Sequence, residues 1–328
     1  MASLSFAPGA KVSRIRIKPA RQVAQPANEQ RGETAMSLTV GVIGLGNIGG
    51  GVAANLRQAG YAVLGYDTDA ARIAAAGAEP AVDAAAIAAA CDLAILAVAT
   101  FDAYAASIEA LAENARDGLV VVDLCTFPIA DKHAALDRLA GAGAAYLDGP
   151  VSGARPQAQA GELAMMVSGD AAAYTRVEPA LAAFTRAVSH VGDFPMSQKL
   201  KLALNLMISI QNLLCAEGFL FAEKAGVDLA LFADMVKQSA ANSRIFEIRA
   251  DKWISGDYGD PTAELAIQLK DRKIIDDYAA AIGCPTPMFD AAVAFYDRAA
   301  ERGWHRKDAA CVLAVLEEMA GIGRTRNK

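Results

Sequence analysis

Short apolar runs alternate with helical patterns through the first half of the chain. The apolar runs predict β-strands at 38–45, 61–67, 93–98, 119–124 and 144–149. Four helical patterns lie between them: one ends at the glycine stop Gly60, one runs through Ala76, and two cover 103–115 and 130–141. Strands that alternate with helices at this spacing predict a doubly wound, mainly parallel α/β sheet.

The strand pattern stops after Gly192, and longer amphipathic patterns follow. They predict helices at 197–225, 228–239, 262–282, 287–302 and about 308–321. The second half of the chain is therefore predicted to be an all-α domain, joined to the first by the long helix. We place the boundaries at 1–36 for a disordered extension, 37–198 for the α/β domain and 199–328 for the helical domain.

A glycine-rich turn, GLGNIG, lies between the first predicted strand and the helix that follows it. Gly44 permits a tight turn, Gly46 lets the backbone approach a pyrophosphate, and Gly49 allows the helix to pack closely on the strand. The phosphates would then lie at the helix N-terminus. This arrangement predicts a Rossmann domain that binds a dinucleotide. The predicted cofactor-binding residues of the turn are Gly44, Leu45, Gly46, Asn47, Ile48 and Gly49.

The second predicted strand ends in Asp67, eighteen positions after Gly49. An acidic side chain there accepts hydrogen bonds from the adenosine ribose hydroxyls and repels a 2′-phosphate. The sequence therefore predicts NAD in preference to NADP. Arg72 is near enough in the chain to receive such a phosphate, but a solvated helix arginine is the simpler interpretation.

The composition excludes several classes of partner. A net charge of −6 gives no field that attracts phosphate backbones, which argues against nucleic acid. The longest run of low charge, 202–216, is interrupted by two asparagines and a glutamine, which favours a buried helix of a soluble protein over a membrane span. Five scattered cysteines and three histidines form no CxxC pair, so we expect free thiols, a cytoplasmic location and no metal site.

Residues 1–35 carry five Lys or Arg residues before the first acidic residue, Glu29. An Arg-rich, acid-poor leader is typical of an organelle transit peptide, but serine is not abundant here and the apolar periodicity is weak. We favour a disordered extension, or a start at Met36 just before the first strand.

Two further segments carry candidate chemistry. The first, DGPVSGARPQAQAGELAMMVSGD at 148–170, is predicted as a glycine-containing turn that presents the Ser152 hydroxyl and the backbone amides around Gly153. A hydroxyl and two or three N–H donors can hold a carboxylate. Taken alone, such a segment is more often an ordinary loop.

The second segment is a helix in which Lys201, Asn205, Ser209 and Asn212 recur at steps of four, four and three, so that they share one face. Unpaired buried polar groups cost about 1–3 kcal/mol each, so this polar seam either pairs internally or lines a cavity. A seam headed by a lysine at the domain junction suggests an active site. A lysine that extends to solvent at a helix start is the alternative.

Together these segments resemble the β-hydroxyacid dehydrogenases, the family of 3-hydroxyisobutyrate dehydrogenase and tartronate semialdehyde reductase, with 6-phosphogluconate dehydrogenase as a larger relative. The resemblance covers residues 38 to about 320. It rests on GLGNIG, DLCTFP at 123–128, DGPVSG with AGELAMMVSGD, a Lys and an Asn four residues apart, and Lys270–Asp271 in a late helix. Five motifs in the right order are much more specific than any one of them.

The resemblance implies reversible hydride transfer between NAD(H) and a small β-hydroxy acid or semialdehyde, with Lys201 and Asn205 as the catalytic residues. Lys201 would be the acid/base and Asn205 would orient the substrate. The implied substrate-binding residues are Ser152, Gly153, Ala154, Lys201 and Asn205. Beyond the glycine turn and Asp67, the predicted cofactor-binding residues are Ala97, Val98, Thr126 and Lys270.

Lysine suits this chemistry, because a neutral Lys201 amine takes the hydroxyl proton in oxidation and the ammonium donates it in reduction. Burial and the cationic nicotinamide ring should lower the pKa of Lys201. Lys199 offers a competing register, but Ala203, rather than an asparagine, lies four residues after it.

The chain departs from the family pattern near the substrate. Ala154 and Arg155 stand where a second glycine and a small polar residue are usual, and Leu204 replaces a frequent asparagine. These changes leave the dehydrogenase class intact and the substrate open. Arg155 either adds an anion contact or faces solvent, and we expect the latter. Cys125 replaces the usual serine beside Thr126, and we expect it to be a packing residue because no histidine is placed to activate it.

Two other functions stay open on the sequence. Imine reductases share the expected architecture, but they typically have Asp or Tyr where this chain has Lys201. A dinucleotide-binding scaffold without chemistry would be free to lose Lys201 and Asn205, and both are present. The apolar long helix needs further cover, so we expect a homodimer or homotetramer.

Overall fold

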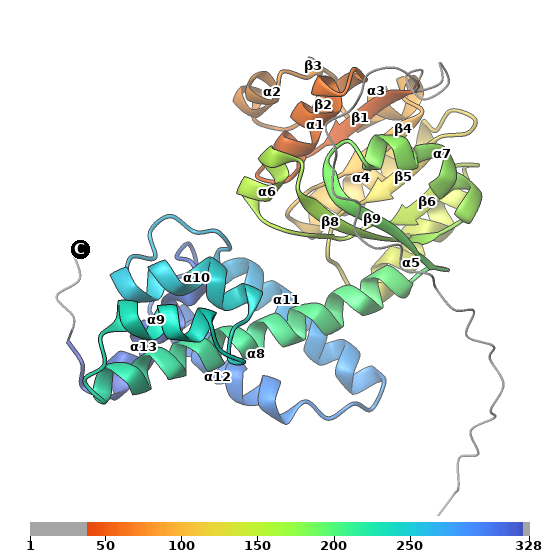
Figure 1. The fold of residues 1–328 in the computed structure, drawn as a ribbon. Helices are drawn as coiled ribbons and strands as arrows, with labels where there is room; N and C mark the ends of the chain where they lie inside the picture. Colours follow the sequence, from red (N-terminus) through yellow and green to blue (C-terminus); the bar gives the residue numbers. More distant parts are fainter. Residues whose placement is uncertain (1–37, 324–328) are drawn as a thin grey trace, which may run out of the picture.

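The computed structural model describes residues 38–323, which form two lobes joined by one long helix, α8 (Met196–Lys224). Figure 1 shows α8 running out of the sheet lobe and through the helical lobe. The predicted extension at 1–36, and the targeting role weighed for 1–35, lie outside the described residues.

Six parallel strands form the main part of the sheet. They are β1 (Thr39–Ile43), β2 (Ala62–Tyr66), β3 (Glu79–Pro80), β4 (Leu93–Leu96), β5 (Val120–Asp123) and β6 (Ala145–Asp148). Their spatial order is 3-2-1-4-5-6, the order of a dinucleotide-binding Rossmann fold. The predicted fold class is confirmed, and the strand order reverses between β1 and β4, where such folds bind their ligands.

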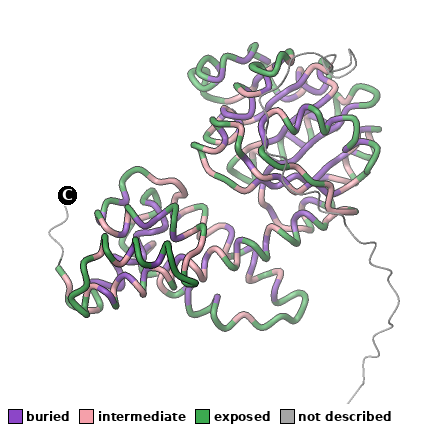
Figure 2. Tube along the Cα trace, in the orientation of Figure 1, coloured by how far each residue is buried: buried purple, intermediate pink, exposed green. Residues whose placement is uncertain are grey.

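Helices cover both faces of this sheet. They are α1 (Gly49–Gln58), α2 (Ala70–Ala76), α3 (Ala84–Ala90), α4 (Phe101–Glu113), α5 (Ile129–Ala140), α6 (Arg155–Ala160) and α7 (Ala171–Leu181). Four of them begin at an Asp or Thr side chain that accepts a hydrogen bond from a backbone N–H of the first turn. Figure 2 shows the buried trace concentrated in the strands and the exposed trace on the outer helices and loops.

The sheet continues beyond the predicted strands. The additional strands are β7 (Val151–Ser152), β8 (Leu163–Gly169) and β9 (Thr185–Gly192). β8 pairs antiparallel with β6 and β7 and parallel with β9. The segment 148–170, predicted as a turn, is therefore strand, helix and strand. The apolar run LAMMVSG is typical of a strand, which the predicted turn across 148–170 did not include.

The second lobe is helical, as the sequence predicts. Its helices are α9 (Leu229–Lys237), α10 (Arg244–Ser255), α11 (Leu265–Ala281), α12 (Pro287–Glu301) and α13 (Val312–Met319), with a 3-10 turn at Ala309–Cys311. The helices predicted from the sequence do not include α10, because its charged residues obscure the apolar pattern of its buried Phe246, Ala250 and Trp253. Both of its ends carry typical helix-boundary residues, because Ser243 caps the first turn and Gly256 ends the helix in a left-handed conformation.

Helix α8 buries its polar side and exposes part of its apolar side. Its buried positions are Ser197, Gln198, Leu202, Asn205, Ser209, Asn212, Ala216, Phe219 and Ala222. Five large apolar side chains, 38–78% exposed, form what we call the outer stripe: Leu200, Leu204, Met207, Leu214 and Phe221. By length and composition α8 is also able to cross a membrane, which is weak evidence because core helices share those properties.

Candidate active site

The glycine turn has the shape that a dinucleotide requires. Gly44 has a φ of +85°, and a Cβ there would lie 2.7 Å from the Ala97 carbonyl oxygen. A Cβ at Gly49 would lie 1.8 Å from the Gly44 carbonyl oxygen, so a side chain would push α1 off the turn. A Cβ at Gly46 would meet nothing within 4 Å, so this position opens onto free space. Two glycines therefore allow tight packing and the third leaves room for a pyrophosphate.

Asp67 fastens the glycine turn to the end of β2. Its Oδ2 accepts a hydrogen bond from the Leu45 amide at 2.7 Å, and its Oδ1 accepts one from the Asp69 amide at 2.9 Å. Arg72 Nη1 lies 3.7 Å from the same Oδ1. A carboxylate has about four lone-pair sites, so ribose hydroxyls can still bind. The sequence did not predict that Asp67 also holds the turn.

A cleft of about 750 Å³ runs from the glycine turn to the helical lobe. Four of the predicted cofactor residues line it, namely Leu45, Gly46, Asn47 and Lys270. Three others lie beside the turn: Ile48 packs on the core, while Ala97 and Val98 contact Gly44 from the end of β4. Arg72 of α2, which the sequence offered as a possible phosphate contact, also lines it. The sequence did not predict the lining from α6 and from the start of α11, because only the tertiary fold brings those helices to the glycine turn.

The predicted carboxylate-binding turn follows β7. Ser152 is half-buried at the end of that strand, and Gly153 has a φ of +140°, a conformation that glycine adopts far more readily than other residues. The Ala154 amide already donates to Gln157 Oε1 at 2.9 Å. Of the three predicted positions, Ala154 therefore has its N–H engaged within α6.

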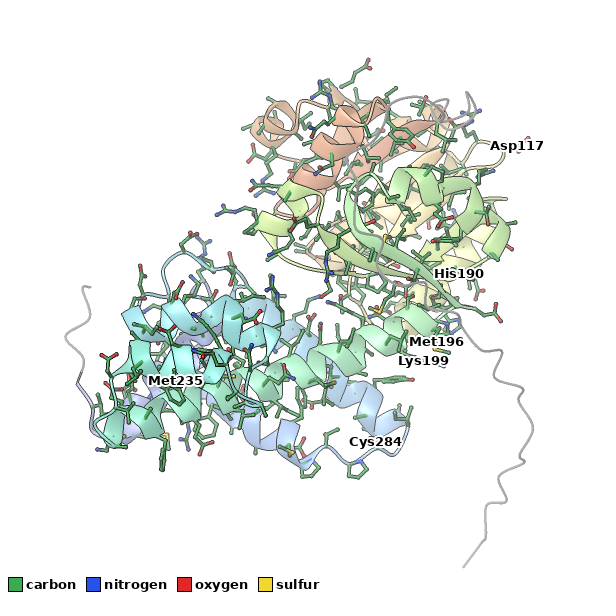
Figure 3. The ribbon with its side chains drawn as sticks, viewed as in Figure 1. Asp117, His190, Met196, Lys199, Met235 and Cys284 are labelled. Atoms are coloured by element: carbon green, nitrogen blue, oxygen red, sulfur yellow. The ribbon has the colours of Figure 1, made fainter. Side chains whose placement is uncertain are left out.

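Lys201 points from α8 to this turn. Its Nζ donates a hydrogen bond to the Val151 carbonyl at 3.0 Å, directly before Ser152. Burial lowers the pKa of Lys201, and the nearby charge of Lys270 lowers it further, against an opposing effect of Asp271. Lys199, the competing register, is exposed, and Figure 3 shows it at the surface near the start of α8.

A chain of contacts joins the two lobes. It runs through Asn205, Asp271, Lys270 and Thr126. Asn205 Nδ2 donates to Asp271 Oδ2 at 2.8 Å, and Asp271 Oδ1 lies 3.0 Å from Lys270 Nζ. Lys270 Nζ donates to the Thr126 carbonyl at 2.6 Å and lies 5.1 Å from the centre of the Phe127 ring. Helix α11 therefore brings Lys270 to the end of β5 and Asp271 to α8.

The lower half of the polar seam pairs internally. Ser209 Oγ donates to the Asn205 carbonyl at 2.8 Å. Asn212 Nδ2 donates to Tyr296 Oη at 2.9 Å and to the Ala309 carbonyl at 3.0 Å. Every member of the seam thus pairs within the protein, which is the first alternative that the sequence offered. Lys201 and Asn205 do so at the lobe junction, and Ser209 and Asn212 inside the helical lobe.

A fully buried ion-pair network joins the sheet to the start of α8, and no local sequence pattern predicts it. Lys132 Nζ lies 2.9 Å from Asp123 Oδ2 and 2.5 Å from Asp148 Oδ1, with all three side chains inaccessible to solvent. Ser197 Oγ, at the start of α8, donates to Asp148 Oδ2 at 2.5 Å. Burial alone would lower the pKa of Lys132, but the two carboxylates outweigh it and raise the pKa. The lysine therefore stays charged and ties α5, β5, β6 and α8 together.

Cys125 lies two residues after Asp123 of this network, just beyond the end of β5. Its thiol donates to the carbonyls of Leu96 and Val98 at 3.5 and 3.4 Å. Burial, reinforced by the charge of Asp123, raises the pKa of this thiol well above its usual value. A thiol that resists ionisation is not a nucleophile, which agrees with its predicted packing role.

An open glycine cradle at the N-terminus of α1 fits the diphosphate of a dinucleotide, and a partly desolvated lysine lies at the lobe junction. Fold and site together define the class of a nicotinamide dinucleotide-dependent oxidoreductase.

Comparisons with known proteins support this class and narrow it. The family described as the NAD binding domain of 6-phosphogluconate dehydrogenase matches residues 39–192, and the family described as NAD-binding of NADP-dependent 3-hydroxyisobutyrate dehydrogenase matches 196–316. An L-threonate dehydrogenase of Cupriavidus necator is 32% identical over 86% of this chain and 97% of its own length. The chain belongs to the β-hydroxyacid dehydrogenase family, whose members oxidise hydroxyl groups with NAD or NADP.

Solved structures agree with this assignment. The crystal structure of 3-hydroxyisobutyrate dehydrogenase from Salmonella typhimurium has a TM-score of 0.78 and 29% identity, covering 84% of this chain and 99% of that one. An imine reductase from Pseudomonas sp. has a TM-score of 0.56, 21% identity, and coverage of 85% and 99%. The latter likeness is one of fold alone.

Proposed function

We propose that this enzyme transfers a hydride between NAD(H) and a small β-hydroxy acid or its semialdehyde, with Lys201 as general acid/base. The observation that carries the proposal is the placement of the Lys201 amine at the junction of the lobes, 3.0 Å from the carbonyl that precedes Ser152. A substrate of the size of 3-hydroxyisobutyrate, tartronate semialdehyde or L-threonate is favoured, because named relatives act on 3-hydroxyisobutyrate and L-threonate.

The dinucleotide, when bound, supplies the hydride acceptor or donor. Lys201 accepts the proton of the substrate hydroxyl during oxidation. Its neutral amine donates an N–H to the Val151 carbonyl, which leaves the nitrogen lone pair free to accept that proton. In the reverse direction the ammonium gives that proton to the developing alkoxide. Asn205 is held by Asp271 and orients the substrate hydroxyl beside the amine.

The substrate carboxylate binds to the turn after β7. Ser152 supplies its hydroxyl and Gly153 its backbone N–H, which together give a carboxylate two donors. Ala154 contributes its amide only if Gln157 gives up the hydrogen bond at 2.9 Å. Thr126 and Lys270 lie at the cofactor side of the same junction, where Lys270 closes the site near the nicotinamide.

The test is steady-state NADH formation or consumption with a panel of small β-hydroxy acids and semialdehydes, including L-threonate. We expect Lys201→Ala to lower kcat by about 10²–10⁴-fold on the active substrate, the usual contribution of general acid–base catalysis. NADH binding should be retained. Lys199→Ala is the matched control, because this exposed lysine lies two residues earlier on the same helix.

Equal activity of Lys201→Ala and Lys199→Ala would remove Lys201 from the chemistry. Tight NADH binding without turnover of any panel member would favour the imine reductase or the non-catalytic scaffold. Lys201 in place of the Asp or Tyr typical of imine reductases supports the dehydrogenase instead.

NAD is the proposed cofactor in preference to NADP, because the Asp67 carboxylate lies at the end of β2 where a 2′-phosphate would meet its charge. Arg72 lines the cleft but is paired with Asp67 and Asp69, at 3.7 and 3.5 Å. Both carboxylates compete with a phosphate for this arginine.

A second copy of the chain is the proposed cover for the outer stripe of α8, giving a homodimer or homotetramer. Its five side chains follow steps of four, three, seven and seven residues, which keep them on one face of a helix. All five cysteines are free, which supports a reducing location such as the cytoplasm. Cell fractionation with organelle markers tests that location.

A further inference from the structure

Arg155 lies at the mouth of the cofactor cleft, on the first turn of α6. This helix packs against α1 so closely that a Cβ on Gly51 would lie 2.6 Å from the Ala158 carbonyl. Arg155 and Gln159, one turn apart on α6, line the cleft together with Gly50 and Gly51. The expectation that Arg155 merely faces solvent is therefore incomplete, since the half-exposed side chain borders the glycine turn.

The partner of Arg155 belongs to the other lobe. Arg155 Nη2 lies 3.5 Å from Asp260 Oδ1, with the two side chains 53% and 87% exposed. Asp260 is part of the segment between α10 and α11, whose backbone is held by Lys252 at the Asp260 carbonyl and by Asp308 at Thr262. In Figure 1 this segment is the loop that rises from the helical lobe toward α6. The ion pair thus bridges the two lobes over the cleft.

Among the cations that line the cleft, Arg155 is held least strongly by its ion-pair partner. Of the three cations that line the cleft, Arg72 is paired with two carboxylates and Lys270 with Asp271 and the Thr126 carbonyl. An exposed pair such as Arg155 with Asp260 contributes little, because water screens it and both side chains lose freedom. Arg155 therefore loses little free energy when it leaves Asp260 for an anion of higher charge.

The lining of the cleft indicates which anion that is. Ser152, Gly153 and Lys201, the proposed substrate contacts, do not line this cleft among the described residues, whereas Gly46, Asn47 and the first turn of α1 do. The cleft holds three cations against one acidic residue, Glu264. A diphosphate at the glycine turn is the anion this arrangement fits, and guanidinium binds phosphate with paired hydrogen bonds.

We propose that Arg155 is a phosphate-binding residue of the dinucleotide site, and that it leaves Asp260 for the cofactor's diphosphate when the dinucleotide binds. Asp260 is then a competitor of the cofactor for the same guanidinium. The two members of one ion pair consequently affect cofactor affinity in opposite directions. This inference rests on the dinucleotide site and not on the identity of the hydroxy acid.

The test is equilibrium titration with NADH, followed by its fluorescence, and with ADP-ribose, which keeps the diphosphate and lacks the nicotinamide. We expect Arg155→Ala to raise the Kd of both ligands about tenfold, the lower range for a charge-assisted hydrogen bond. Arg155→Lys should recover part of the loss. Asp260→Asn should lower both Kd values about two- to threefold, as expected from removing an exposed competitor.

The matched controls are Arg138→Ala and Glu109→Gln, which break an exposed pair of 2.7 Å between α5 and α4. They should leave both Kd values unchanged. Equal weakening by Arg155→Ala and Asp260→Asn would mean that the pair only shapes the cleft and would overturn the proposal. So would an unchanged Kd in Arg155→Ala, or an effect confined to NADH. Because no substrate is present, failure here is distinct from failure of the proposed reaction.

Discussion

At the scale of single residues, Asp67 holds the glycine turn in addition to the cofactor-binding role that the sequence predicts. It accepts hydrogen bonds from the amides of Leu45 and Asp69, and it is also the proposed partner of the adenosine ribose. A substitution therefore acts on the glycine turn as well as on cofactor choice, and only the ratio of the two cofactors separates these effects.

Asp67→Ala is expected to raise the ratio of kcat/KM for NADP to that for NAD by about tenfold or more, or about 1.4 kcal/mol. The reason is that the carboxylate charge is removed and Arg72 is freed for a 2′-phosphate. The measurement is the pair of kcat/KM values, with thermal unfolding as a control for a loosened turn. A ratio equal to that of wild type would show that Asp67 only holds the turn.

Lys201 sets the expected pH dependence. Oxidation needs the neutral amine, so kcat/KM for oxidation should rise with pH through the pKa of Lys201, which burial places below the ordinary 10.5. Reduction needs the ammonium and should fall through the same pH. The charge of Asp271 raises this pKa, so Asp271→Asn should move the rise to lower pH. A rise centred at or above 10.5 in wild type would contradict the proposal.

At the scale of elements, α8 carries residues of the proposed site on one face and the outer stripe, the proposed contact with a second copy, on the other. Its inner face carries Lys201 and Asn205 at the lobe junction, and Ser209 and Asn212 inside the helical lobe. Its outer stripe leaves apolar surface in water, where burial of such surface contributes about 25 cal/mol per Å². Each polar residue of the inner face has a hydrogen-bond partner, and a second copy of the chain is the proposed cover for the apolar ones.

The oligomer is expected to dissociate when charge is placed in the outer stripe. Leu204→Glu combined with Met207→Glu should give a lower molar mass by size exclusion with light scattering, because two buried carboxylates at an interface are costly. Val82→Glu is the control, since Val82 is 85% exposed on the sheet lobe, away from α8. A wild-type monomer, or an unchanged mass in the double variant, would refute the role of this face.

At the scale of the whole molecule, the residues of the proposed site come together only where the lobes meet. Lys270 of α11 reaches the end of β5, and Lys201 of α8 reaches β7. The buried network of Asp123, Lys132 and Asp148 receives Ser197 and so fixes where α8 leaves the sheet. Removing one partner of such a network costs about 3–5 kcal/mol, so the position of α8 is well defined.

Local patterns alone were enough for much of this protein. The alternation of apolar runs and helical patterns determined the parallel α/β class, and GLGNIG determined the dinucleotide turn, because both depend on residues close together in the chain. The spacing of Lys201, Asn205, Ser209 and Asn212 likewise placed them on one helix face. Short-range periodicity and glycine conformation need no knowledge of the rest of the fold.

Tertiary structure alone decided which of these residues meet. The seam divides between site and core because Asp271 faces Asn205, while Tyr296 and Ala309 face Asn212. Lys132 is buried because two carboxylates from separate strands converge on it, and Arg155 borders the cofactor cleft because α6 packs on α1. Such pairings join residues far apart in the chain, and no local pattern specifies the partner of a charge that the fold brings to it.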